Sequence, residues 1–187
     1  MMRFPWMLPL ALLAWAAPNV HAADWQADVA ASRLEFIATF EKTPVSGTFK
    51  SFDARLVLVA DKPGDARLDV TIAVGSADMQ TAEVNSAIAG PDWFDFAHYP
   101  QAEFHATDIR AVEANRLVAR GVLRLKGVAQ PVEFPFQWSE TGKSARMTGE
   151  FTLKRGAFGI GAGEWAATNV IGADVKVRVD MRFVQRG

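Results

Sequence analysis

The sequence predicts an all-β domain of about eight to ten strands with one short helical insertion, in a sheet that can close on itself. The first observation is that apolar and polar residues alternate with a period of two, as in 147–154 and 175–183. This period is typical of strands that bury one face. The second is that the predicted strands are long for a sandwich and suit a barrel or a strongly curved sheet. The third is that the inward positions are mostly large and aromatic.

The composition is that of an ordinary globular protein. Half of the residues are apolar and 22% are charged. A chain of 187 residues is long enough for one domain with a sizeable core. The formal net charge of −1 does not indicate a nucleic-acid-binding surface. The chain has no cysteine, so we expect it to fold without disulfides.

Residues 1–22 have the pattern of a cleavable signal peptide. Arg3 supplies the positively charged n-region, and an apolar run interrupted by Pro9 follows it. Val20-His21-Ala22 then has small residues at the two positions that a signal peptidase recognises. A membrane anchor or a buried helix is the alternative, but the run is shorter than the roughly 20 residues that span a bilayer. We therefore expect cleavage before Ala23, export to the periplasm, and one domain over 23–187.

The elements before residue 90 are predicted in chain order. Alternation predicts strands at 34–41, 45–49, 56–58 and 67–74. The segment Asp61-Lys62-Pro63-Gly64-Asp65 has strong turn chemistry. Alternation stops at residue 75, after which Asp78 or Thr81 could cap a short helix that runs to Ala89 and stops at Gly90. We expect this to be the one helix of the mature chain.

Strands resume after an aromatic cluster, Trp93-Phe94-Asp95-Phe96, which we expect in a loop or a single turn. Turns are predicted near 113–115 and 141–143. The alternating segments lie at 102–106, 117–125, 132–138, 147–154 and 174–184.

Alternation also indicates which side chains face the interior. Aromatic residues dominate ordinary cores, so these side chains could simply fill a core. A register error of one residue would exchange the inner and outer faces. With those alternatives open, the lumen candidates are Phe36, Phe104, Leu123, Leu125, Phe134 and Phe151, and the candidates for the entrance or wall are Trp93, Phe94 and Phe158.

Four segments carry recognisable motifs. They are SGTF at 46–49, WFDFAHYPQAEF at 93–104, LRLKGVAQPV at 123–132 and RGAFGIG at 155–161. In the same order they resemble the x-G-x-F element, the F-D…Y-P…F signature, the strand with its R/K-G-V-T turn, and the R-x-x-F-G-I segment of the YceI-like family. The resemblance runs along the whole predicted mature chain.

The resemblance implies an exported, antiparallel, lipocalin-like β-barrel that holds a long isoprenoid chain, such as a quinone tail, in its lumen. One segment departs from the family pattern. Many members have an R-D-x-H-L helix before the F-D element, and residues 82–93 lack that arginine and histidine. A head-group contact made there by other members does not carry over to this chain.

Candidates for catalysis and metal binding are few. Glu103 and His105 share a strand face that we expect in water, and we expect His98 to bond to the backbone of its loop. A zinc site needs at least three converging protein ligands, so we predict no metal and no catalytic residue. Arg155 could bond a carbonyl head group or pair with a structural carboxylate.

The leading hypothesis is a periplasmic protein that sequesters or carries a polyisoprenoid or isoprenoid quinone, without catalysis. It could touch the membrane or a quinone-reactive membrane protein transiently, and it could form a homodimer. One alternative is an enzyme acting on a lipid or amide through His98, Asp92 and Asp95. The other is a barrel with a packed core that binds another protein and leaves no cavity of ligand size.

Overall fold

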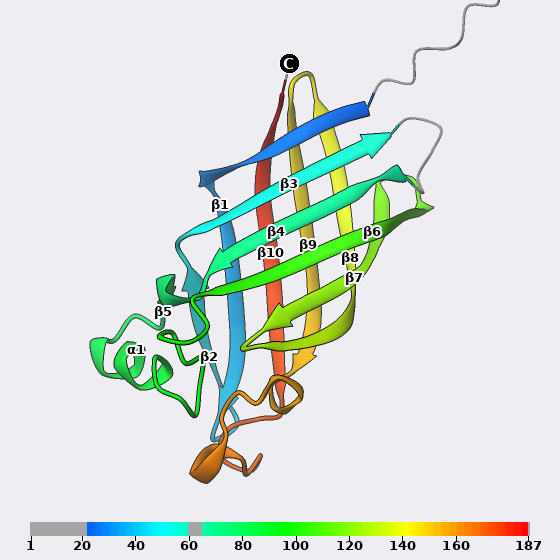
Figure 1. The fold of residues 1–187 in the computed structure, drawn as a ribbon. Coiled ribbons are helices and arrows are strands. Elements are labelled where there is room, and N and C mark those ends of the chain that lie inside the picture. Colours follow the sequence, from blue (N-terminus) through cyan, green and yellow to red (C-terminus); the bar gives the residue numbers. More distant parts are fainter. Residues whose placement is uncertain (1–21, 60–64, 187) are drawn as a thin grey trace, which may run out of the picture.

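Eight antiparallel strands close into a barrel, as Figure 1 shows for the computed structural model, which describes residues 22–59 and 65–186. The ring runs β10-β9-β8-β7-β6-β4-β3-β1 and closes between β1 and β10, and two further strands, β2 and β5, extend from β1. The strands are β1 (Ala22–Phe40), β2 (Thr43–Phe49), β3 (Phe52–Val59), β4 (Arg67–Ala73), β5 (Ala77–Asp78), β6 (Gln101–Glu113), β7 (Arg116–Leu125), β8 (Val128–Thr141), β9 (Ser144–Lys154) and β10 (Asp174–Gln185). The predicted all-β barrel is confirmed.

Strand β1 serves two parts of the sheet. Its residues 22–26 pair with β3 and its residues 34–40 pair with β2, while β10 lies along the other side of both halves. The pairing with β10 shifts register between Asp28 and Arg33, and Figure 1 shows the strand turning there. As a result β2 continues the wall at one end of the barrel, next to the helical insertion.

The end of the barrel near the described termini is filled by aromatic side chains. Trp138 packs edge to face on Trp25 at 5.4 Å and against Phe183 at 5.3 Å between ring centroids. All three are buried, and stacked or edge-to-face aromatic pairs bury large apolar areas. This end of the barrel is therefore closed by a core.

In the opposite half of the barrel, Pro131 and Pro135 leave part of β8 unpaired with β9, and this unpaired stretch is a seam in the sheet. The N–H of Trp138 donates to Asn115 on the β7 side, so the alternate positions of β8, including Pro131 and Pro135, direct their nitrogens toward β9. A proline nitrogen has no hydrogen to donate. The β8–β9 ladder accordingly starts only at Phe136. A 3-10 turn, Arg155–Phe158, lies against β8 at this seam, where Gln130 donates to the Ala157 carbonyl.

The predicted helix is present as α1 (Ala82–Ile88), beside the β2 end of the barrel. Thr81, one of the two predicted caps, occupies the N-cap position, but its side chain makes no cap bond. The helix start is held instead by Asn85, which accepts the Met79 N–H and donates to Asp78. Within 22–59 and 65–186, no helix is long and apolar enough to cross a membrane.

The predicted signal peptide, 1–22, lies outside the described residues except for Ala22, the first residue of β1. The turn predicted at 61–65 also lies outside them, except for Asp65.

Candidate ligand cavity

A cavity of about 690 Å³ occupies the half of the barrel opposite the tryptophan core. Its floor includes the buried side chains of Leu68, Met147 and Met181, which also belong to that core. Pockets for small molecules typically measure about 300–1,000 Å³. The alternative of a fully packed barrel is therefore wrong.

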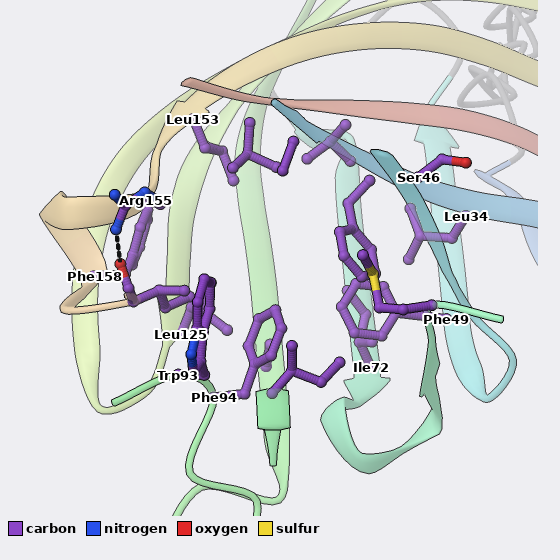
Figure 2. Close-up of a pocket in the computed structure, with 18 of the residues that line it drawn as sticks. Leu34, Ser46, Phe49, Ile72, Trp93, Phe94, Leu125, Leu153, Arg155 and Phe158 are labelled. Atoms are coloured by element: carbon purple, nitrogen blue, oxygen red, sulfur yellow. Dashed lines mark hydrogen bonds between the residues drawn. The ribbon is translucent and has the colours of Figure 1, made fainter. Parts of the chain in front are cut away.

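All ten predicted site residues line this cavity. Figure 2 shows Trp93, Leu125, Arg155 and Phe158 on one side and Phe49 with Leu34 on the other. The wall thus agrees with the inward register predicted from alternation, and the binding role of these residues stays a prediction. The ten are Phe36, Trp93, Phe94, Phe104, Leu123, Leu125, Phe134, Phe151, Arg155 and Phe158.

An aromatic cluster forms the wall beside β2. Phe94, from the loop after α1, approaches Phe36 and Phe49 at 6.1 and 6.2 Å between centroids, and Phe36 lies 5.0 Å from Phe49. Gly47 allows this packing, because a Cβ there would overlap the Phe36 ring and the Met79 sulfur. The loop aromatic is thereby fixed against two strands.

Arg155 is buried in the cavity wall and bonds only to the main chain. Its guanidinium donates to carbonyl oxygens at 2.8–3.5 Å, so of the two alternatives left open by the sequence, pairing with a structural carboxylate is wrong. Burial lowers the pKa of Arg155 below its ordinary value. The guanidinium organises the loop that carries its partners, Ile160, Gly161, Trp165, Ala167, Ile171 and Gly172.

A second cation joins that loop to the one after α1. Lys126 Nζ donates to the carbonyls of Pro91 and Gly159 at 2.6 and 2.7 Å. The N–H groups of Gly161 and Ala162 donate to the Asp92 carbonyl. These bonds make the two loops one cap over part of the cavity. Lys126 was missed by sequence reasoning, although it stands in the turn of the 123–132 motif.

The cavity opens between the β1–β2 hairpin and α1. The lining residues at this mouth include Phe40 and Val84, each 40% exposed, and the exposed polar residues Gln80 and Thr81. The residues predicted for the entrance or wall, Trp93, Phe94 and Phe158, line the cavity but do not include these mouth residues. Val84 did not stand out in the sequence, because α1 also contains the apolar residues Ala82, Ala87 and Ile88.

The two described histidines lie outside the cavity lining. His98 Nδ1 lies 2.8 Å from Asp95 Oδ1, so its expected side-chain bond to the backbone is wrong. His105 is exposed on the outer face of β6 and contacts Asp69. Over the residues described, no three His, Asp or Glu side chains converge in a way that could hold a metal ion.

Comparison with known proteins decides the family. The model of the YceI-like domain matches residues 25–183. The chain belongs to the YceI-like family. It is 30% identical to a UPF0312 protein of Pseudomonas putida over 139 residues, which are 71% of this chain and 72% of that protein. It is 35% identical to a UPF0312 protein of Photorhabdus laumondii over 86 residues, a match that spans 46% of this chain and only 44% of that protein.

Solved structures agree with this assignment. BcnA of Burkholderia cenocepacia is 31% identical and superimposes with a TM-score of 0.80, covering 83% of this chain and 98% of BcnA. A polyisoprenoid binding domain from Saccharophagus degradans, implicated in plant cell wall breakdown, has a TM-score of 0.67 at 15% identity, with 87% and 98% of the two chains covered. At that identity the likeness supports the lipocalin-like barrel fold and nothing finer.

Proposed function

We propose that this protein binds a long-chain isoprenoid, such as an isoprenoid quinone, in the barrel cavity and carries or sequesters it in the periplasm. The observation that carries the proposal is the cavity itself, whose lining is almost wholly apolar. The name of the Saccharophagus degradans domain, a polyisoprenoid binding domain of the same fold, gives the ligand class further support.

Burial of the tail supplies the driving force. Each methylene removed from water contributes about 0.8 kcal/mol, so several isoprene units contribute amply. The competing environment is the bilayer rather than water. Affinity therefore depends on how well the wall packs against the tail and on the few polar groups near the mouth.

The mouth is suited to transient contact with a membrane. Phe40 and Val84 expose apolar surface at the point where the cavity opens. A tail that passes between bilayer and cavity there would meet little water on the way. This arrangement supports carriage of a lipid that is insoluble in water.

Binding without catalysis is the function that we favour. The enzyme alternative relied on His98, Asp92 and Asp95, and none of these side chains lines the cavity. If they catalysed a reaction, replacing each singly would abolish turnover without unfolding the protein, whereas a carrier should keep its bound lipid.

Mass spectrometry of the organic extract of the protein, purified from the periplasm of a bacterial host, tests the proposal. We expect a stoichiometric isoprenoid or quinone. Val70→Trp, on the cavity wall, should reduce the bound lipid and the uptake of added quinone. Val122→Trp, on the outer face of β7, is the matched control and should leave both unchanged. A clean extract together with no uptake would refute the proposal.

A further inference from the structure

We infer that the cavity selects a ligand whose polar end carries no net charge, such as an alcohol, an amide, an ester or a quinone, over a carboxylate, phosphate or amine of equal chain length. The inference rests on the proposed function and adds the class of head group. It follows from the charged and polar groups of the wall.

The wall offers one charged side chain. Of the described residues that line the cavity, only Arg155 is ionisable as a cation, and none is a carboxylate. The other polar side-chain groups are uncharged: hydroxyls, one amide and indole N–H groups. In Figure 2 the hydroxyl of Ser46 points away from the labelled apolar side chains. A cationic head group would thus find no anion in this wall.

Arg155 has no N–H group left for an anion. A guanidinium carries five N–H donors. Nε donates to Gly172, Nη1 donates to Ile160 and Gly161, and Nη2 donates to Trp165 and Ile171. The side chain is 5% exposed, so water does not reach it freely to mediate a contact.

An ionised head group inside the cavity would therefore lose its hydration without gaining a charged or N–H partner. Such desolvation is far more costly for an ion than for a hydroxyl or carbonyl. The positive charge of Arg155 would attract an anion. Carbonyl oxygens of the loop already surround the guanidinium, however, and its N–H groups would become available only if the loop moved away. An uncharged head group loses much less on entry.

Isothermal titration calorimetry with farnesol and farnesoic acid tests the inference, because the two differ only at the polar end and are short enough to enter the cavity. The affinity for farnesol should not change between pH 4.5 and pH 8. The affinity for farnesoic acid should fall about tenfold per pH unit above its own pKa, since only the protonated acid binds. Farnesol also controls for a general effect of pH on the protein.

A gain-of-function variant tests whether weak binding of the acid is due to the lack of a charged partner in the cavity rather than to a general effect of pH. Val84→Arg places a free guanidinium at the mouth, and Val122→Arg adds the same charge on the outer face. Only Val84→Arg should restore binding of farnesoic acid at pH 8. Equal binding of acid and alcohol by the wild type at pH 8 would overturn the inference, as would no recovery in Val84→Arg. If neither ligand binds at any pH, the proposed function fails as well.

Discussion

Removal of the Arg155 guanidinium should destabilise the barrel more than loss of any exposed arginine. Its five N–H groups donate to carbonyls of the loop that supplies Ile160, Trp165 and Ile171 to the cavity wall. A hydrogen bond to a charged group contributes about 1.5–3 kcal/mol, but such bonds are not additive and exposed carbonyls of the loop can turn to water. We therefore expect Arg155→Met to lower the free energy of unfolding by about 3–5 kcal/mol.

The assay is urea unfolding followed by tryptophan fluorescence, with hydrogen exchange to locate the change. Arg155→Lys should not rescue stability, because an ammonium has three donors and lacks the planar fork that reaches both ends of the loop. Exchange should accelerate first at 159–172. Arg120→Met is the control, since Arg120 is exposed and pairs only with Glu133, a contact of about 0–1 kcal/mol. A loss below 1 kcal/mol in Arg155→Met would refute this reasoning.

Three further changes test other parts of the structure. Gly47→Ala should cost about 1–3 kcal/mol of unfolding free energy, because the new Cβ overlaps the Phe36 ring; urea midpoints equal to wild type would contradict the packing described. Lys126→Met should speed hydrogen exchange in the two loops of the cap, and unchanged exchange would mean that Lys126 does not join them. Bonds from Lys50, then from Asn85 and the Gln80 N–H, hold the pKa of Asp78 well below its ordinary 3.8, so its contribution to stability is present above that pH and is lost as pH falls further. Asp78→Asn should therefore lose less stability than wild type on acidification below pH 3.8, and identical acid profiles would exclude this role.

Local alternation was enough to predict which face of most strands is buried. Leu123, Phe134 and Phe151 line the cavity as expected, because a period of two leaves only two possible faces and polar residues occupy the other. The first half of β1 escaped prediction. Only Trp25 and Ala27 are well buried there, and its strand geometry is imposed by pairing with β3 and β10, which are distant in the sequence.

The partners of Arg155 could not be predicted in the same way. A buried guanidinium usually indicates a carboxylate, whereas here carbonyls between residues 160 and 172 satisfy it. Every residue has a main-chain carbonyl, so the residue types do not show which carbonyls will accept a hydrogen bond from Arg155. Only the folded path of the loop brings them to one point.

Residue periodicity and short motifs were enough to predict the barrel class, its inward faces and its family. Whether the apolar interior is packed or hollow was decided by the tertiary structure. Aromatic side chains interlock at the Trp25 end, whereas at the other end a different set of aromatic side chains lines a cavity of about 690 Å³. There the β8–β9 ladder ends at Phe136, next to Pro135, and two loops held by Arg155 and Lys126 cover only part of the cavity. The volume of the cavity depends on how strands and loops that are distant in the sequence pack together, and a local sequence pattern does not contain this information.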